Sequence, residues 1–427
     1  MPKREPTVAF DHHSAAVAAD PAKAYAALRT TTPVFWTESY GGYWVFTKYA
    51  HLAEMLAHPD KFSSARRDDA GGPGSSVSIP KRPSREQYPL ELDPPRSTAY
   101  RKILNPLMSP AAAERMRPGI RDRVHWFIDQ FIERGSCDLV SELTSAVPSS
   151  FTADWLGLPH HLWPMLAETM HNISSRAQSD PLWGEAAVNL QKMYASIEAV
   201  VAERRAHPAD DVISVIVGSQ VDSEPIADEA AVSVTALLVA GGVDTTTSLT
   251  SQALVWLSEN REHHDHLLAD RKFLRSACEE FLRYFSPNQA LGRTMNGEAE
   301  IGGCPIHDGD RMLIGFASAN RDGEAFPDAD TLMLDRFPNR HLAFGLGVHR
   351  CVGSNIARVI FDEVITGVLG RLPDYTIDVS GLEHYHSQGL MSGWKTAPAR
   401  FTPGLPIGAP LDLHAFRVTA GRERQNP

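Results

Sequence analysis

Most of the chain places apolar residues at the three- and four-residue spacing of amphipathic helices. This pattern runs with short breaks from Pro110 to Gly218, and its longest stretch runs from Ile226 to Glu259. At about 1.5 Å per residue, that stretch would be about 50 Å long, enough to cross a domain. Alternating β-branched and aromatic residues, typical of strands, are confined to short segments near both ends, such as Val34 to Thr37 and Tyr43 to Tyr49. The pattern predicts a mainly α fold with small β-sheets, and Gly41-Gly42 predicts a hairpin between the last two segments.

No internal repeat or linker interrupts this pattern, so we expect residues 19–427 to form a single domain. Residues 1–18 are polar and are expected to form a solvated N-terminal tail, which includes the adjacent His12 and His13. Ser63 to Pro95 is rich in glycine, proline, serine and charge, so it should be irregular. A long loop inside a compact protein is often functional.

Charge and cysteine content narrow the class of protein. The 427 residues contain 41 Lys and Arg against 52 Asp and Glu, a formal net charge of −11. This acidic balance, with no long basic run, argues against nucleic-acid binding. The four cysteines are scattered without a CxxC pair, which favours neither a disulfide framework nor a zinc site and fits a reducing compartment. They are Cys137, Cys278, Cys304 and Cys351.

Neither a targeting segment nor a membrane span is expected. The first residues lack the apolar core of a signal peptide. The longest apolar run, around Val234 to Val243, is too short and too rich in glycine to span a bilayer. We therefore expect a cytoplasmic protein with no membrane partner.

The middle of the longest helical stretch has unusual chemistry for a buried helix. It reads Ala240-Gly241-Gly242-Val243-Asp244-Thr245-Thr246-Thr247. Each glycine costs about 1 kcal/mol relative to alanine, and the aspartate and threonines put polar groups near the centre of the fold. Glycines and polar residues inside a central, buried helix run against ordinary helix preferences, and such exceptions are expected at functional sites. The alternative is that Asp244 and the threonines are satisfied locally, as helix caps or at a kink.

A second unusual stretch runs from Phe344 to Gly353 and places Cys351 at the end of a glycine-punctuated loop. The helical pattern from Ser354 to Leu372 follows at once. Glycines permit backbone conformations and close approaches that a side chain would block. A cysteine here lies near helix-terminal N–H groups, which stabilise the thiolate that binds metals. The loop therefore predicts a metal-binding sulfur; the alternative is a small buried hydrophobic residue.

These ten residues resemble the haem-binding loop of the cytochrome P450 family, Phe-Gly-x-Gly-x-His-x-Cys-x-Gly, with every fixed position filled. The resemblance implies that Cys351 is the thiolate ligand of a haem iron. It also implies that His349 bonds a haem propionate, that Phe344 packs near the sulfur, and that Gly345 and Gly353 help to cradle the cofactor.

Other signatures of the family follow in the right order. Arg101 lies in the helix that Asp93-Pro94-Pro95 begins, and it resembles a propionate-binding arginine, although a solvated helix face is the alternative. Ser97 stands where the family often has a histidine, which leaves a second contact from this helix open. Arg293 resembles a further propionate-binding residue; buried carboxylates need such cationic partners.

Glu280 and Arg283 share a helix face, because residues three apart are neighbours on a helix. Alone, such a pair is worth little. With the cysteine loop it matches the Glu-x-x-Arg signature of the family, where the pair is buried and joined by a later arginine, here Arg336. The resemblance implies a structural role for all three.

The family fold implies a haem between the long central helix and the Cys351 loop. Gly241 would then face the cofactor, while Asp244 and Thr245 would deliver protons to dioxygen. Asn288 and Gln289 hint at a hydrogen bond to the substrate. The positions expected to line the substrate pocket are Ala240, Asn288, Leu291 and Leu390.

The resemblance implies a monooxygenase that uses haem b to insert one atom of dioxygen into a C–H bond. The substrate would be a small-to-medium apolar terpenoid, steroid, fatty acyl or aromatic compound. No flavin domain is fused, so electrons would come from a separate ferredoxin and its reductase. The ferredoxin would dock on a basic patch of this protein; the alternative is that these basic residues are merely scattered and solvated. The patch would comprise Arg101, Lys102, Arg350 and Arg358. We expect a monomer; a peroxide-driven peroxygenase and a non-catalytic haem sensor or carrier stay open.

Overall fold

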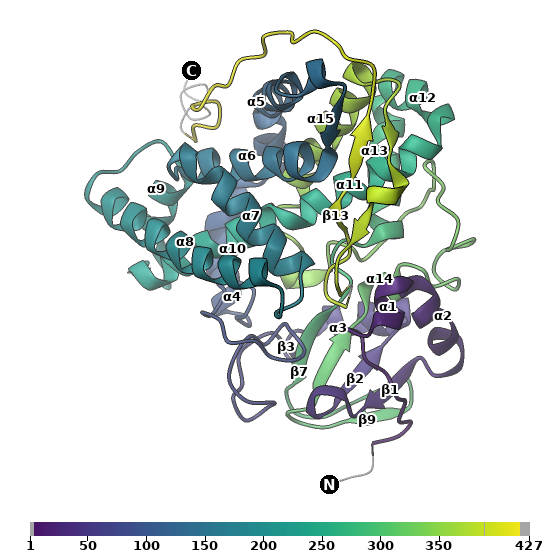
Figure 1. Cartoon of the computed structure of the whole chain (residues 1–427). Coiled ribbons are helices and arrows are strands. Elements are labelled where there is room, and N and C mark those ends of the chain that lie inside the picture. The colour runs from purple at the N-terminus through teal and green to yellow at the C-terminus, as the bar shows by residue number, and fades with distance from the viewer. Residues whose placement is uncertain (1–3, 388, 419–427) are drawn as a thin grey trace. The chain divides into compact units, whose positions relative to one another are not determined.

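The computed structural model describes residues 4–387 and 389–418 of the chain (Figure 1). These residues fold into two compact units, each built from segments that are far apart in the sequence. Unit 1 contains Met1–Tyr100, Glu279–Cys351 and His386–Ser392, and unit 2 contains Arg101–Cys278, Val352–Tyr385 and Gly393–Pro427. The expectation that residues 19–427 form one domain stays a prediction.

Unit 1 is organised around a five-stranded sheet with the order β1-β2-β10-β7-β3 (Figure 1). β2 and β10 are parallel, and the other neighbours are antiparallel. The strands are β1 (Val34–Thr37), β2 (Tyr43–Phe46), β3 (Phe62–Ser63), β7 (Leu291–Met295) and β10 (Arg311–Ile314). Trp44 and Phe46 pack into one apolar cluster, whereas Tyr43 and Val45 pack into another, so both faces of the sheet are covered.

The predicted hairpin is confirmed, since Val34 pairs with Phe46 and Thr37 with Tyr43. Gly42 has a φ of +97°, and a Cβ there would lie 2.1 Å from the Trp36 ring, so the turn requires glycine. The second strand is shorter than predicted, because helix α3 (Tyr49–Ala57) already begins at Tyr49.

The remaining elements of unit 1 are short. They are the helices α1 (Ala15–Ala19), α2 (Pro21–Thr31) and α14 (Phe316–Ala319), the hairpin β8 (Ala299–Ile301) with β9 (Cys304–Ile306), and the 3-10 turns η1 (Ser39–Gly41) and η6 (Gly347–His349). Helices α4 (Arg96–Leu107) and α13 (Arg271–Phe285) each have residues in both units.

The expectation of a solvated tail is wrong for residues 4–18. The Val8 N–H donates to Trp36 O, and the Trp36 N–H donates to Pro6 O, both at 2.8 Å. The segment thereby pairs with the otherwise open edge of β1, which is why a polar sequence is held in place. His12 and Val17 are buried. Residues 1–3 lie outside the described part of the chain.

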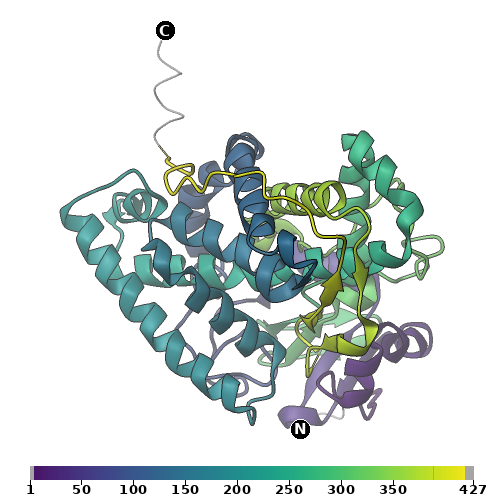
Figure 2. The same cartoon turned by 45° about the horizontal axis from the view of Figure 1, so that its top comes forward.

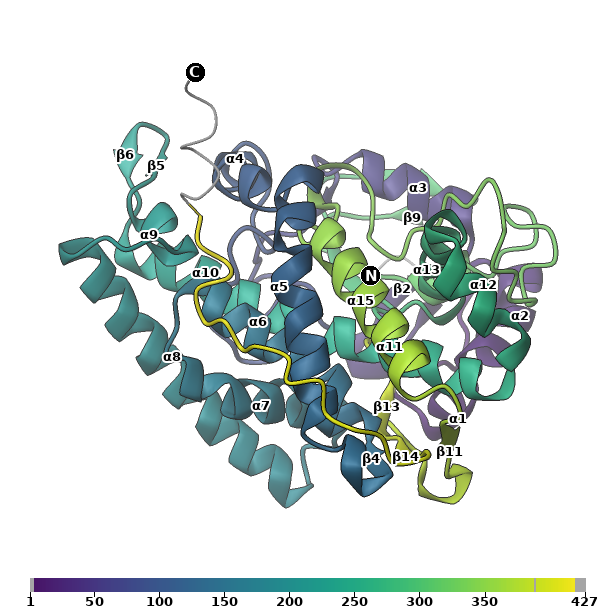
Figure 3. The same ribbon diagram turned by 90° about the horizontal axis from the view of Figure 1, so that it is seen from above.

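Unit 2 contains most of the helices. Its helix α5 packs along α15 (Figure 3), and α7 packs along the long helix α8 (Figures 1 and 2). The helices are α5 (Pro110–Asp129), α6 (Ala146–Leu156), α7 (Trp163–Ser175), α8 (Pro181–Ala206), α9 (Val212–Val217), α10 (Asp228–Gly242), α11 (Asp244–Glu259), α12 (His264–Ala269) and α15 (Ser354–Arg371).

Short turns and sheets complete unit 2. The turns are η2 (Ile132–Arg134), the π-helical η3 (Val140–Thr144), η4 (His160–Leu162), η5 (Arg261–His263) and η7 (Val379–Gly381). A three-stranded sheet has the order β11-β14-β4, from Thr376–Ile377, Pro398–Arg400 and Ser136–Asp138. The hairpins are β5 (Gln220–Val221) with β6 (Glu224–Pro225), and β12 (Glu383–His384) with β13 (Trp394–Thr396).

The predicted central helix from Ile226 to Glu259 is two helices. α10 ends at Gly242, Val243 has the distorted angles φ −90° and ψ −74°, and α11 begins at Asp244. The break comes directly after Gly241 and Gly242, and glycine destabilises a helix more than any residue except proline. Asp228–Glu259 has the length and composition of a membrane span, but 72% of its most apolar window is buried inside the protein, as in a core helix.

Candidate functional site

The Cys351 loop presents its sulfur at the surface of unit 1, whereas the other three cysteines are buried. The Cys351 N–H donates to Phe344 O at 2.7 Å, which folds the two ends of the loop together. Gly347 has a φ of +67°, and a Cβ there would lie 2.6 Å from Leu56 O, so only glycine fits this turn. Gly345 also has a positive φ, of +66°. Helix α15 begins three residues after the cysteine, at Ser354.

Asp244 forms a buried hydrogen-bonded cluster with two residues that the sequence did not single out. Its side chain is buried, and its Oδ1 lies 3.0 Å from Nδ1 of His171 on α7. Its Oδ2 accepts from the Tyr385 hydroxyl at 2.9 Å. His171 Nε2 lies 3.1 Å from the carbonyl oxygen of Lys395 on β13. A carbonyl oxygen can only accept, so His171 Nε2 carries a proton; when Asp244 is a carboxylate, Nδ1 carries one as well, and the ring is an imidazolium.

The charges in this cluster stabilise one another. Burial alone would lower the pKa of His171, but the hydrogen bond and charge of Asp244, helped by the Lys395 carbonyl, raise that pKa above its ordinary value against the repulsion of Arg176. Burial and the Asp244 carboxylate raise the pKa of Tyr385 well above its ordinary value. Asp244 is thus held between an imidazolium and a neutral phenol.

Thr245, Gly241 and Gly242 lie next to the break between α10 and α11, where the structure is more open. The Thr245 hydroxyl donates to Gly241 O at 2.8 Å, the backward bond that loosens a helix. Gly241 is exposed although Val239 and Val243 are buried, and a Cβ on Gly241 would meet nothing within 4 Å. Thr245 and Ala240 are half-buried. The structure therefore leaves space beside Gly241, next to the break between α10 and α11.

Arg293 of unit 1 is buried in surroundings that suit an anion-binding residue. It is 3% exposed, and its Nη1 donates to Gly292 O at 2.8 Å. No described carboxylate forms an ion pair with it, and burial lowers its pKa to about 10, although Asp93 opposes this. A buried, uncompensated guanidinium is costly unless a negative group joins it.

Ser97, at the start of α4, points to the same chemistry. Its hydroxyl is buried and has no hydrogen-bond partner among the described residues. Arg101 lies four residues further along this helix and is half-buried, so the two side chains share a face. An exposed thiol, an uncompensated buried arginine and an orphaned hydroxyl fit a cofactor that carries a metal and carboxylates.

Glu280, Arg283 and Arg336 meet in a buried cluster of unit 1. Arg283 donates from Nη2 to Glu280 Oε1 at 2.7 Å and from Nε to Oε2 at 2.8 Å. Arg336 Nε lies 3.1 Å from both oxygens, and the Met333 N–H donates to Oε1 at 2.8 Å. Burial opposes ionisation, but the bonds from Arg283, the Met333 amide and Arg336 lower the pKa of Glu280. Arg283 and Arg336 also donate to carbonyls of residues 320–331, so the cluster fixes the segment that leads to the Cys351 loop.

The sequence model of cytochrome P450 matches residues 17–372. This chain belongs to the cytochrome P450 family. The predicted fold, mainly α with small β-sheets, is confirmed: solved members of the family superpose on the chain. The family consists of haem-thiolate monooxygenases, and the chain is an oxidoreductase of this class.

Known relatives match over nearly the whole chain. The steroid C26-monooxygenase of Mycolicibacterium smegmatis is 30% identical, with 90% of this chain and 94% of the relative covered. The linalool 8-monooxygenase of Pseudomonas putida is 30% identical, with 81% and 88% covered. The crystal structure of CYP109E1 from Bacillus megaterium in complex with testosterone is 27% identical and has a TM-score of 0.79. The match covers 90% of this chain and 98% of that one.

The remaining predicted residues of this P450 are distributed over both units. Phe344, Gly345 and His349 are half-buried in the loop of unit 1, whereas Gly353 caps α15 in unit 2. Of the proposed basic patch, Lys102 and Arg350 are exposed and belong to different units.

The segments with Asn288 and Leu390 lie side by side in unit 1. The Gln289 N–H donates to Leu390 O at 2.8 Å. In the orientation that satisfies its amide, Asn288 donates to Leu390 O at 3.1 Å and to Ala290 O at 3.2 Å. Gln289 Nε2 donates to Phe285 O and Ser286 O. Both amide groups donate to the backbone, and the expected hydrogen bond from Asn288 or Gln289 to a substrate stays a prediction.

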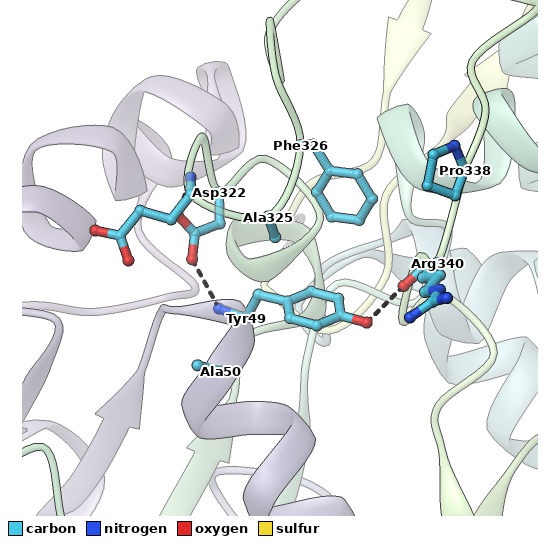
Figure 4. A pocket seen from close by; sticks show the side chains of 8 residues that line it. Tyr49, Ala50, Asp322, Ala325, Phe326, Pro338 and Arg340 are labelled. Carbon is cyan, nitrogen blue, oxygen red and sulfur yellow. Dashed lines mark hydrogen bonds between the residues drawn. The ribbon is translucent and has the colours of Figure 1, made fainter.

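Unit 1 also has a surface pocket with a cavity volume of about 330 Å³ (Figure 4). Tyr49 crosses its floor: its N–H donates to Asp322 at 2.9 Å and its hydroxyl donates to Arg340 O at 2.7 Å, with Phe326 packed edge-on. No predicted site residue lines it. The lining residues are Tyr49, Ala50, Asp322, Glu324, Ala325, Phe326, Pro338 and Arg340.

Proposed function

We propose that this P450 inserts one atom of dioxygen into a C–H bond of a small-to-medium apolar compound. The observation that carries the proposal is the exposed sulfur of Cys351 in a complete haem-loop sequence, on a folded turn that ends at the start of α15. A steroid or terpenoid is the favoured substrate, because relatives that match nearly the whole chain are named for steroid and linalool oxidation. Fatty acyl and aromatic compounds are the other classes.

The cofactor that fits these residues is haem b. Cys351 would hold its iron, and Arg293 would pair with a propionate, with Arg101, His349 and the Ser97 hydroxyl as further donors. When bound, the haem supplies the activation of dioxygen, which a thiolate ligand promotes by donating electron density. The protein supplies the sulfur, the protons and the position of the substrate.

Asp244 and Thr245 are the proposed proton-handling pair. His171 and Tyr385 hold the buried Asp244 side chain in place through hydrogen bonds to both of its oxygens, and a positioned carboxyl group can accept and pass on a proton. The Thr245 hydroxyl, which donates to Gly241 O, lies beside the open space at the helix break. A peroxide-driven enzyme would not need such a pair, because peroxide already brings the protons and electrons.

We further propose that residues 19–427 act as one haem-thiolate monooxygenase domain. Electrons would come from a separate ferredoxin and its reductase, attracted by Arg101, Lys102, Arg350 and Arg358. The proposed form is a cytoplasmic monomer that binds neither nucleic acid nor membrane.

Turnover with defined reductants tests this function. Steroids and terpenoids that shift the haem spin state would be incubated with NADH, a surrogate ferredoxin and a ferredoxin reductase, and the products analysed by mass. The expected product carries one added oxygen atom from dioxygen. Product only with hydrogen peroxide would instead indicate a peroxygenase, and binding without product under either condition would indicate a sensor or carrier.

A further inference from the structure

His12 and His13 of unit 1 lie ring against ring, with an interplanar angle of 43°, and His13 is half-buried. Their ring centroids lie 4.1 Å apart, and His12 is completely buried. Nε2 of each ring lies 2.9 Å from the same acceptor, the carbonyl oxygen of Ile79. Because a carbonyl can only accept, both Nε2 atoms carry a proton. One carbonyl of the 63–95 loop is therefore bound by two histidines.

The other ring nitrogens have partners that suit neutral histidines. His12 Nδ1 lies 2.8 Å from the Tyr43 hydroxyl, and His13 Nδ1 lies 2.6 Å from the Ser387 hydroxyl. Ser387 Oγ also accepts from the Gly389 N–H, so its own proton is available for His13. A neutral imidazole with a proton on Nε2 accepts at Nδ1, and both hydroxyls can donate to it.

The surroundings of the pair disfavour protonation. Burial lowers the pKa of both rings; for His12, the neighbouring His13 lowers it further, and Arg82 acts in the same direction on both. The Ile79 carbonyl opposes this for both rings, and Asp11 opposes it for His13. The only other titratable rings against the pair are the phenols of Tyr40 and Tyr43 among the described residues.

Through these bonds the pair connects separate segments of unit 1. Ile79 belongs to the 63–95 loop. Ser387 belongs to a segment that we call the 386–392 turn, of which the structure describes residues 386–387 and 389–392. Gly389 of this turn packs directly on the pair: a Cβ there would lie 2.4 Å from His12 O. The turn is bonded to the 287–291 segment, since the Gln289 N–H donates to Leu390 O and the Ser392 N–H donates to Pro287 O. The Gly292 N–H closes the ring of segments by donating to Val77 O at 2.7 Å.

We propose that His12 and His13 are positioning residues of the substrate site, which act by holding the Ile79 carbonyl and the 386–392 turn together. The inference rests on the proposed function, because only that function places the 63–95 loop, Asn288 to Leu291 and Leu390 around a substrate. The neutral pair is the holding state. Because the surroundings hold the pKa of both rings below the ordinary histidine value of about 6.5, the pair is protonated only as the pH falls through these lowered values, and affinity for a pocket-filling ligand should fall there.

Two haem ligands of different size separate this role from general damage. Imidazole reaches the iron alone, whereas econazole also fills the pocket with its aromatic arms. His13→Ala should weaken econazole binding about tenfold, because it removes two partly buried hydrogen bonds, and should leave imidazole binding unchanged. His13→Gln can still donate to Ile79 O and accept from Ser387, so it should bind econazole almost as the unmodified protein does. His58→Ala, at an exposed site of the same unit, is the control.

The pH dependence is measured as the ratio of econazole affinities between the unmodified protein and the double variant His12→Gln, His13→Gln, which cancels the titration of the ligand. The ratio should stay constant near neutral pH and fall at acid pH, where the lowered pKa values of the two rings lie. Hydrogen exchange supplies a readout without ligand: peptides that cover residues 75–80 and 386–392 should exchange faster in His13→Ala than in the control.

Wild-type econazole affinity together with wild-type exchange in His13→Ala would overturn the proposal, as would a constant affinity ratio from acid to neutral pH. Equal weakening of imidazole and econazole would also overturn it, because the change would then be at the haem. If the protein lacks a thiolate-ligated haem, the proposed function fails, while the exchange experiment still decides whether the pair holds these segments.

Discussion

Replacing Asp244 with asparagine removes one negative charge from a buried cluster and changes almost nothing in shape. In the structure, one carboxylate oxygen faces the His171 imidazolium and the other accepts from Tyr385. The amide of Asp244→Asn can keep both contacts if His171 gives up one proton. Its oxygen then accepts from Tyr385, its NH₂ donates to His171 Nδ1, and His171 Nε2 still donates to Lys395 O.

The magnitudes follow from this rearrangement. Truncating a partner of a buried ion pair usually costs about 3–5 kcal/mol, but here every hydrogen-bonding group keeps a partner. The free energy of unfolding should therefore fall by only about 1 kcal/mol at neutral pH. The pKa of His171 should drop below its ordinary value, because burial remains and the opposing charge is gone. Turnover should fall about 100-fold, a typical contribution of a positioned acid or base.

The assay separates these effects. Turnover is measured with NADH, a surrogate ferredoxin and its reductase, substrate affinity by the spin-state shift, stability by urea, and the His171 pKa by NMR. Product formation driven by hydrogen peroxide should be unaffected. Asp228→Asn, at an exposed carboxylate at the start of α10, is the matched control. Equal losses of turnover, affinity and stability would show that Asp244 is structural, and unchanged turnover would remove it from proton handling.

Three further outcomes are expected. Thr245→Ala loses the hydroxyl that donates to Gly241 O and should still consume NADH but release hydrogen peroxide instead of product; tight coupling in this variant would exclude Thr245 from the proton route. Glu280→Gln leaves the guanidinium groups of Arg283 and Arg336 without their shared carboxylate. The free energy of unfolding, measured in urea, should fall by about 3–5 kcal/mol. A loss no larger than that of the exposed control Glu298→Gln would contradict the structural role of the cluster. Because the pKa of His171 is raised, the stability that its charged ring contributes is complete below pH of about 6.5 and is lost as the pH rises through the raised pKa. The difference in free energy of unfolding between the unmodified protein and His171→Gln should therefore narrow with rising pH. A constant difference would refute the imidazolium assignment.

The sequence was informative wherever function depends on residues close together in the chain. The Cys351 loop and the Glu280–Arg283 pair have short, fixed spacings, and the family match and the buried ion cluster agree with what they predicted. The odd composition around Asp244 likewise marked a real feature, since the central helix breaks there.

What the sequence could not predict depends on contacts between distant segments. His171 and Tyr385 lie 73 and 141 residues from Asp244, and a single histidine or tyrosine on an element carries no sign of its partner. The N-terminal segment is polar and seemed solvated, because the open edge of β1 and the Ile79 carbonyl that hold it exist only in the folded protein. The backbone acceptors of the Asn288 and Gln289 amides are likewise visible only in three dimensions.

The absorption spectrum of the reduced carbon monoxide complex tests the central claim most directly. With Cys351 as the thiolate ligand, the purified protein should show the long-wavelength Soret band of thiolate-ligated haem, and Cys351→Ser should lose it. An imidazole-type band in the unmodified protein, or a thiolate-type band that survives Cys351→Ser, would show that another residue holds the iron and would contradict the proposed chemistry.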